Sequence, residues 1–221
     1  GSEMCIRDRA MNVVNERKRP YIVMEGMSDR FMATYKRPFE AKDIKVVMYA
    51  GGLHERYGLK KLTEAFMMLP QENFRLKLFG SGPFVEKLKT KYTKKDSRIQ
   101  YMGVAPNAEV VAAELDASLL VNPRPTHEEF TKYSFPSKNI EYMASGTPLL
   151  TTKLPGMPKE YYPYVFLIEN ESVEGYAKAL ESVLAQSDEE LYVFGEKAKD
   201  FVLEKKNSFE QAKRVIELIK L

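Results

Sequence analysis

The chain has 221 residues, of which 44% are hydrophobic and 29% charged, and 34 basic and 31 acidic residues leave a formal net charge of +3. This balance is typical of a soluble globular protein with one large domain, and it gives no support for binding to nucleic acid or to an anionic membrane surface. A single cysteine excludes an internal disulfide, two histidines argue against a zinc site, and no apolar run approaches the ~20 residues that span a bilayer.

The first residues look foreign to the rest of the chain. Gly1-Ser2 resembles a tag-cleavage scar, and residues 3–11 (EMCIRDRAM) have neither a helical nor a strand period and resemble translated adapter sequence. We therefore leave residues 1–10 out of the fold and expect residues 1–19 to be a tag-derived or linker segment. The sequence has no recognisable signal peptide, and with a lone cysteine this fits a reducing, cytoplasmic location.

Two short segments precede the regular part of the chain. Residues 21–25 (YIVME) have a strand-like pattern, and the turn-rich residues 26–43 are expected to form a linker.

From residue 44 onward, apolar runs alternate with amphipathic segments. Residues 44–50 (IKVVMYA) are typical of a buried strand, and residues 59–69 have apolar side chains at helical spacing. The same alternation predicts further strands over 74–80, 98–103, 117–123, 147–152 and 164–169, and helices over 84–92, 108–115, 137–145, 172–185, 187–204 and 208–220.

This alternation predicts the fold class, an α/β fold with a Rossmann-like parallel sheet flanked by helices on both faces. Strand–helix–strand crossovers of this kind are right-handed almost without exception. Ligands on such sheets bind at the carboxyl ends of the strands. The loops that follow the strands are therefore the places to look for functional residues.

The first of these loops is YAGGLHERYG (49–58). Gly51 and Gly52 would let the backbone approach a bound group, and the following helix would offer N–H groups to an anion. A tight strand-to-helix turn explains the same residues. The spacing is not G-x-G-x-x-G, so the dinucleotide fingerprint is absent. The second loop, FGSGP (79–83), is also best explained as a turn, although it could face a ligand.

The longest polar connection is VNPRPTHEEFTKYSFPSKNIE (121–141). Long loops in compact domains are usually functional or disordered, and the aromatic and proline residues of this one argue against disorder. It contains the bases Arg124, Lys132 and Lys138, the acids Glu128 and Glu129, and the aromatics Phe130, Tyr133 and Phe135.

The helix predicted over 137–145 begins with a Pro-Ser-Lys turn. Ser137 suits an N-cap or an early-turn hydroxyl, and Lys138 and Glu141 are three residues apart on the polar side. A phosphate at this helix start would gain from the N–H groups, the helix dipole and the lysine charge, and Glu141 could accept hydrogen bonds from a vicinal diol such as ribose. A solvated Lys–Glu pair is an equally good explanation.

Several sequence blocks occur together in order. They are KVVMYAGGL followed by YGLKKLTEAF, then LKLFGSGP, IQYMG, LLVNP, FPSKNIEYMASGTPLLTT and LPGMPKEY. Over roughly residues 20–220, this ordered set resembles the C-terminal half of the retaining GT-B glycosyltransferases of family 4 (group 1). It is most similar to bacterial enzymes that build surface polysaccharides.

The resemblance implies a domain organisation. Enzymes of this family have two Rossmann-like domains, of which the C-terminal one binds the nucleotide-sugar donor and the N-terminal one binds the acceptor. By this resemblance, residues 20–43 are the interdomain strand and linker remnant, and residues 44–205 are the nucleotide-sugar-binding domain. Residues 206–221 would form a helix that packs toward the missing N-terminal acceptor domain. We therefore expect the fragment to be inactive alone.

The resemblance also implies site residues. Glu141 falls on the motif glutamate that binds the donor ribose. The diphosphate-binding turn falls on Gly51-Gly52 and on the Ser137-Lys138 helix start. Val104, just after the third predicted strand, falls where the backbone commonly meets the base.

The sequence departs from the family pattern at the first motif acid. Eight positions before Glu141, where an acid is common, stands Tyr133. Glu128 or Glu129 could take the role only across a local insertion of four or five residues. Catalytic residues therefore stay unassigned, with Glu128, Glu129 and Tyr133 as candidate contacts of the donor sugar.

The first loop also departs from the pattern. Gly52 stands where an arginine is common, and Tyr57 stands where a lysine is common. Arg56 and Lys138 are the candidates for the missing positive charge.

These features together predict a metal-independent glycosyltransferase. The sequence has no Asp-x-Asp motif to bridge a metal to a diphosphate, so we expect no metal and no cofactor, and a UDP- or GDP-linked sugar as substrate. The expected partners are this donor and the acceptor domain, without nucleic acid. Peripheral membrane association of the full-length enzyme stays open. The alternatives are a GT-B-type sugar-nucleotide epimerase and a non-catalytic Rossmann-like scaffold module.

Overall fold

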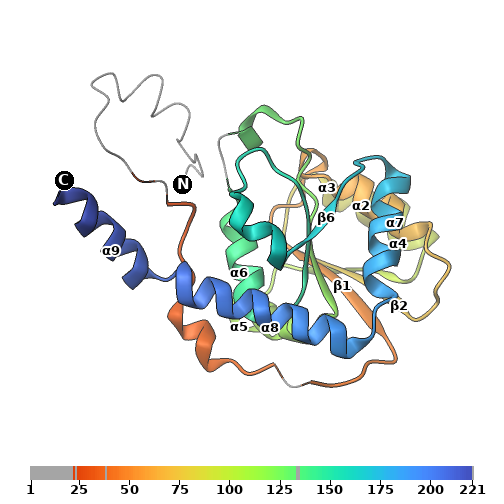
Figure 1. Ribbon diagram of the computed structural model, residues 1–221. Helices are drawn as coiled ribbons and strands as arrows, with labels where there is room; N and C mark the ends of the chain where they lie inside the picture. The colour runs from red at the N-terminus through yellow and green to blue at the C-terminus, as the bar shows by residue number, and fades with distance from the viewer. Residues whose placement is uncertain (1–21, 23, 38, 133–134, 221) are drawn as a thin grey trace.

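The computed structural model describes residues 22, 24–37, 39–132 and 135–220. Within these residues, six parallel strands form one sheet in the order β3-β2-β1-β4-β5-β6 (Figure 1). The strands are β1 (Lys45–Ala50), β2 (Phe74–Phe79), β3 (Ile99–Gly103), β4 (Leu119–Asn122), β5 (Leu149–Thr152) and β6 (Phe166–Ile168).

The central strand β1 is covered on both faces. Val47 and Tyr49 belong to the apolar cluster on one side of the sheet, whereas Val46 and Met48 belong to the cluster on the other side. A parallel strand that is buried on both faces needs an almost continuous apolar run, which is the pattern of residues 45–50. The backbone pairs with β2 along the whole of β1, and with β4 through Val47 and Met48.

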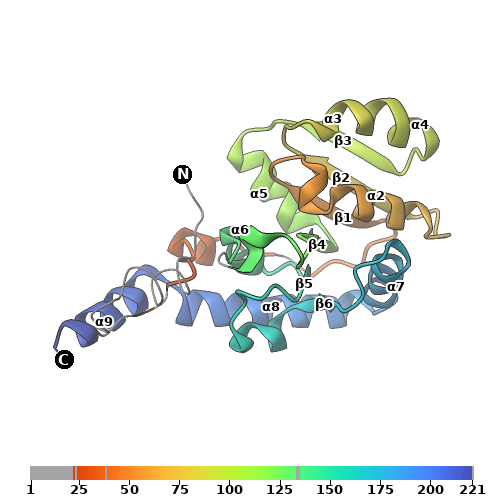
Figure 2. The same cartoon turned by 90° about the horizontal axis from the view of Figure 1, so that it is seen from above.

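Helices form the two outer layers (Figures 1 and 2). One face carries α2 (Leu59–Met67), α3 (Phe84–Lys87), a π-helical turn η4 (Leu88–Tyr92), α4 (Thr93–Lys95) and α7 (Val173–Leu184). The other face carries α5 (Asn107–Asp116), α6 (Ser137–Ser145) and α8 (Asp188–Lys205), and α9 (Ser208–Ile219) extends beyond the sheet. Short 3-10 helices are η2 (Arg30–Thr34), η3 (Glu55–Tyr57), η5 (Glu129–Lys132) and η6 (Lys159–Tyr164).

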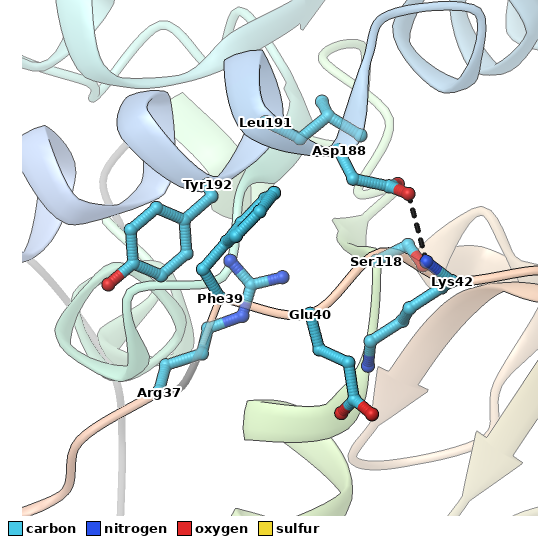
Figure 3. A pocket seen from close by; sticks show the side chains of 8 residues that line it. All are labelled: Arg37, Phe39, Glu40, Lys42, Ser118, Asp188, Leu191 and Tyr192. Atoms are coloured by element: carbon cyan, nitrogen blue, oxygen red, sulfur yellow. Dashed lines mark hydrogen bonds between the residues drawn. The ribbon is translucent and has the colours of Figure 1, made fainter.

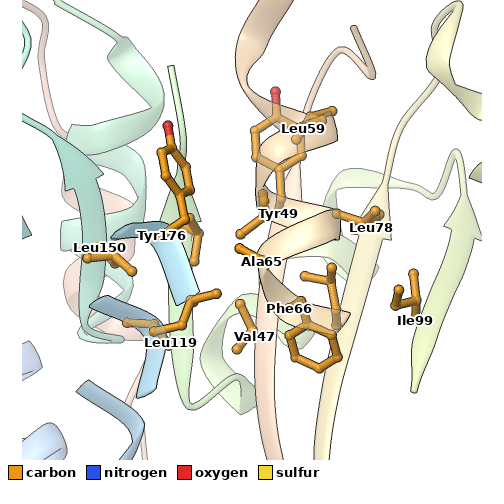
Figure 4. Packing of buried hydrophobic residues seen from close by; sticks show 14 of the residues in the cluster. Val47, Tyr49, Leu59, Ala65, Phe66, Leu78, Ile99, Leu119, Leu150 and Tyr176 are labelled. Carbon is orange, nitrogen blue, oxygen red and sulfur yellow. The ribbon is translucent and has the colours of Figure 1, made fainter. Parts of the chain in front are cut away.

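The cluster under α2 and α7 shows why these segments are helical (Figure 4). Leu59, Leu62 and Phe66, spaced at three and four residues, are all 0% exposed. They pack on Val47 and Leu78 of the sheet. Fully burying a side chain of this size contributes about 1.5–3 kcal/mol, so the apolar stripe holds α2 on the sheet.

The predicted α/β fold is confirmed, and from residue 44 onward each predicted strand and helix is present with small shifts at its ends. The helix predicted over 84–92 corresponds to α3, η4 and α4 in succession. The strand predicted over 21–25 is wrong where it is described, because residues 22, 24 and 25 form no strand. This segment lies away from the sheet, and just after it the Ser28 N–H donates to the Lys206 carbonyl oxygen at 2.7 Å.

Candidate functional site

The strand order reverses between β1 and β4, the two central strands. In open α/β sheets, ligands bind in the crevice at the carboxyl ends of the strands at such a switch point. The loop of residues 51–58 follows β1, and the loop of residues 123–136 follows β4 and leads into α6. The two loops singled out from the sequence therefore lie side by side at this edge.

The predicted Gly51-Gly52 turn packs against the loop after β2. The Gly51 N–H donates to the Phe79 carbonyl oxygen at 3.1 Å. Gly80 has φ 123°, and a Cβ there would lie 1.9 Å from the Gly51 carbonyl oxygen. Residues 79–83 therefore act as a tight structural turn that supports the first loop. Gly51 and Gly52 themselves stay half-buried at the sheet edge.

A second glycine brings the first and third loops together. Gly58 has φ 83° and caps η3, and a Cβ there would lie 1.8 Å from the Pro123 carbonyl oxygen. Only glycine combines this left-handed backbone with so close an approach. The start of α2 is thereby held against the end of β4.

The start of α6 is fixed to both central strands. The Tyr142 hydroxyl accepts a hydrogen bond from the Ala50 N–H at 2.7 Å and donates to the Ala50 carbonyl oxygen at 3.1 Å. Asn122 Nδ2, at the end of β4, donates to Asn139 Oδ1 at 2.5 Å. Both contacts are buried, so the first turn of α6 is held beside the Gly51-Gly52 turn.

The first turn of α6 presents the predicted serine, lysine and glutamate. Pro136 occupies the N-cap and makes no side-chain capping bond, so Ser137 is the first helical residue and not the cap. Lys138 Nζ lies 2.8 Å from Glu141 Oε2, with the two side chains 29% and 41% exposed. The pair predicted from the spacing is therefore formed. A pair this exposed contributes only about 0–1 kcal/mol, which leaves both side chains able to rearrange around a ligand.

Two arginines and two aromatic rings meet between the first and third loops. The guanidinium carbons of Arg56 and Arg124 each lie 5.2 Å from the centroid of the Tyr57 ring and 5.9 Å from that of Phe130. The two rings are 6.1 Å apart in an edge-to-face arrangement. This cluster puts the predicted Arg56 at the switch point. It also adds Arg124, which the sequence analysis had counted only as one base of a long loop.

The remaining predicted site residues are less closely connected to the switch point between β1 and β4. Val104 follows β3, two strands away from β1, and is 75% exposed. Glu129 begins η5, and the Glu128 carboxylate lies 3.9 Å from His127 Nε2. Tyr133 lies outside the described residues. The identity of the first acid therefore stays a prediction.

An acid from another loop holds the long loop in place. The Glu171 carboxylate, after β6, accepts hydrogen bonds from the Thr126 N–H at 3.1 Å and from Thr126 Oγ1 at 2.5 Å. Sequence reasoning missed this residue, because nothing in the local pattern ties residue 171 to the loop after β4.

A second missed acid lies under the site. Glu114 of α5 is 1% exposed, and neither of its carboxylate oxygens has a hydrogen-bond partner among the described residues. Burial raises its pKa to about 7, with Lys138 pulling the pKa down and Glu141 pushing it up. A signal was present, since the second glutamate of the segment AEVVAAEL follows two alanines and lies among apolar residues.

A pocket at the opposite edge of the sheet has a structural role (Figure 3). Residues that precede β1 and β4 line it, including Lys42, whose N–H donates to Asp188 Oδ2 at 2.9 Å, and Ser118. Arg37 donates there to the carbonyl oxygens of Leu115, Ala117 and Gly146. This pocket therefore seats the linker against α8, away from the carboxyl ends of the strands.

Two further features were searched for in the described part of the chain. No cluster of three or more His, Cys, Asp or Glu side chains lies close enough together to hold a metal ion. Likewise, none of its helices combines the length and apolar character needed to cross a bilayer.

Comparison with known proteins gives a consistent set of relatives. The sequence model described as "Glycosyl transferases group 1" matches residues 33–220. An Escherichia coli (strain K12) protein described as a colanic acid biosynthesis glycosyltransferase, WcaL, is 30% identical over 112 residues, which cover 48% of this chain and 27% of that protein.

Solved structures share the fold. Sucrose-phosphate synthase from Thermosynechococcus elongatus superposes with a TM-score of 0.73 and 19% identity, covering 98% of this chain and 56% of that one. A Staphylococcus aureus TarM mutant in complex with fondaparinux, alpha-GlcNAc-glycerol and UDP has a TM-score of 0.72 and 15% identity, covering 96% and 42%. The chain thus spans between about a quarter and just over a half of the length of these three relatives.

Proposed function

This chain belongs to the group 1 glycosyltransferases, and from this premise we propose that it is the nucleotide-sugar-binding half of a retaining, metal-independent enzyme of family 4. The donor would bind at the carboxyl edge of the sheet, and the acceptor would be held by a separate N-terminal domain. The likeness to WcaL supports a role in bacterial polysaccharide synthesis. A cytoplasmic location is part of the proposal.

The observation that carries the proposal is the position of α6. Its first turn is fixed to the ends of β1 and β4 by Tyr142 and Asn139, and it presents Lys138 and Glu141 at the switch point. The N–H groups at the start of α6, the helix dipole and the Lys138 ammonium suit a diphosphate, and the Glu141 carboxylate suits the ribose diol.

The chemistry would come from positioning and charge stabilisation. As the bond from the sugar to the diphosphate breaks, negative charge grows on the diphosphate leaving group. Donors aimed at developing charge are usually the largest contribution to catalysis. Here they would be the α6 N–H groups and Lys138, with Arg56 and Arg124 from the neighbouring loops. The acceptor would be aligned by the other domain.

Calorimetry with UDP-, GDP- and ADP-sugars tests this proposal. We expect one donor class to bind, and we expect Lys138→Ala and Glu141→Gln each to weaken binding at least tenfold, because charge-assisted hydrogen bonds contribute about 1.5–3 kcal/mol. Lys213→Ala and Glu217→Gln on the exposed side of α9 are charge-matched controls and should bind normally.

The same experiment separates the alternatives. Binding that survives EDTA supports metal independence, and binding lost in EDTA contradicts it. Binding of none of the donors would favour the scaffold module. Conversion of the sugar on the nucleotide without an acceptor would reveal an epimerase, and transfer to an acceptor by this chain alone would overturn the assignment as a donor half.

A further inference from the structure

Glu114 is a buried acid that no part of the donor-binding proposal uses. It lies on α5, which packs against α6 and β1. Val111, one turn earlier on the same face, belongs to the apolar cluster that includes Ile140 and Met143 of α6. A carboxylate that is 1% exposed and lacks hydrogen-bond partners among the described residues is costly when ionised.

The charged side chains that act on Glu114 belong to the proposed donor site. Lys138 of α6 favours the ionised form of Glu114, and Glu141 of α6 opposes it. Of the other ionisable groups on the surrounding elements, the Tyr142 phenol also interacts with Glu114. Arg37 is bound to carbonyls at the end of α5, Lys45 of β1 lies beside Asp188, Asp116 of α5 is paired with Lys42, and Glu109 of α5 is exposed.

We propose that Glu114 is a positioning residue of the donor site, which acts through Lys138 and takes up a proton from solvent when the diphosphate of a nucleotide sugar binds at the start of α6. In the free protein, Lys138 supports a partly ionised Glu114. When the diphosphate brings two further negative charges beside Lys138, the ionised form of Glu114 becomes less favourable. Once Glu114 is neutral, it no longer competes with the diphosphate for the Lys138 ammonium. This inference rests on the proposed function.

The size of the effect depends on how far the Glu114 pKa rises on binding. Two added negative charges beside Lys138 disfavour the ionised form of Glu114, and we take a rise of about one unit, a tenfold change in its ionisation constant, as the expected scale. From a starting pKa of about 7, binding at pH 7 would take up about 0.4 proton. The same linkage makes binding about fivefold weaker at pH 8 than at pH 6.

Calorimetry in buffers of different ionisation enthalpy measures this uptake directly. UDP-glucose and GDP-mannose are suitable probes, because their diphosphate diesters do not titrate in this pH range. The test is the difference between the wild type and Glu114→Gln, because proton exchange by all other groups cancels in that difference. We expect the variant to take up about 0.4 proton less at pH 7 and to lose the fivefold pH dependence.

A control variant and an independent measurement can each contradict the inference. Glu109→Gln, on the exposed part of the same helix, should behave as the wild type. Carbon-13 NMR of the Glu114 carboxyl should show its pKa rising when the donor is added. Equal proton uptake by wild type and Glu114→Gln, or a Glu114 pKa that ignores the donor, would overturn the inference. If neither probe binds, the measurement is made with whichever UDP-, GDP- or ADP-sugar does bind, and binding of none of them would instead contradict the proposed function.

Discussion

Single residues at this site have properties that depend on their surroundings more than on their type. Glu141 and Glu114 both interact with Lys138, yet the Glu141 side chain is 41% exposed and paired at 2.8 Å, whereas Glu114 is buried and its carboxylate has no hydrogen-bond partner among the described residues. The exposed glutamate is suited to exchange its lysine for a ligand. The buried one is suited to hold a proton near neutral pH, because burial disfavours its charged form.

This difference predicts how the stability of the protein depends on pH. The pKa of Glu114 is raised to about 7 from 4.5, so between these values the unfolded chain loses the proton first and folding becomes less favourable as pH rises. The cost is absent below pH 4.5, complete above pH 7 and at most about 3 kcal/mol. Glu114→Gln should therefore be more stable than the wild type at pH 8, with little gain at pH 4.5, as measured by urea unfolding.

The matched variant is Glu109→Gln, whose side chain is exposed and whose effect should be small at both pH values. If Glu114→Gln were equally destabilising at pH 4.5 and pH 8, the buried acid would be needed for packing and its ionisation would carry no cost.

At the scale of elements, α6 connects the fold to the site. Its inner face packs in the cluster with α5 and α8, and its first turn is fixed to the sheet through Tyr142 and Asn139. The helix start cannot drift relative to the Gly51-Gly52 turn as long as these contacts hold. A site built on a rigid element positions a ligand more accurately than one built on a loop alone.

Tyr142→Phe tests this connection. The change keeps the ring but removes the hydroxyl that bonds both the N–H and the carbonyl oxygen of Ala50, so a buried N–H loses its partner. We expect a loss of about 1–3 kcal/mol in unfolding free energy and weaker donor binding, measured by urea unfolding and calorimetry.

Tyr92→Phe provides the comparison, because that buried tyrosine donates to Glu64 at 2.8 Å beneath α2, on the other face of the sheet. It should lower stability without affecting donor binding. Donor affinity that stayed unchanged in Tyr142→Phe would mean that α6 is held in place by packing alone.

At the scale of the whole molecule, the segment that precedes β1 meets the end of α8 at one place. Ser28 forms a parallel bridge with Asn207, and Lys206 Nζ lies 3.3 Å from Glu25 and 2.7 Å from Glu160. The side chains of Lys206 and Glu25 are only 4% and 7% exposed. A buried ion pair therefore joins the linker to the end of α8.

Lys206→Met should destabilise the domain by about 3–5 kcal/mol, because it leaves the Glu25 carboxylate buried without its cation. Adding Glu25→Leu should recover much of this loss, since no buried charge is then left unpaired and the Glu160 carboxylate that remains is 50% exposed. Urea unfolding of the single and double variants measures both effects. Lys87→Met, which breaks an exposed pair with Glu55, should cost at most about 1 kcal/mol, and an equal cost at both sites would refute the special role of burial.

The sequence by itself determined the elements and part of the site. Apolar periodicity is a local property, so the strands and helices from residue 44 onward could be placed within a few residues. The three-residue spacing of Lys138 and Glu141 on one helix indicated that the two side chains could pair or share a ligand, and the pair is formed. The alternation of strand and helix was enough to predict that a ligand would bind at the loops that follow the strands.

Only the tertiary structure decided which distant residues meet there. The parallel pairing of β1 with β4 brings Arg124 to Arg56 across Tyr57 and Phe130, although the arginines lie in different loops. The packing of α5 against α6 buries Glu114 under Lys138, whereas an isolated helix would leave the same glutamate in water. Contacts and burial of this kind depend on strand order and helix packing, which no local pattern of residues contains.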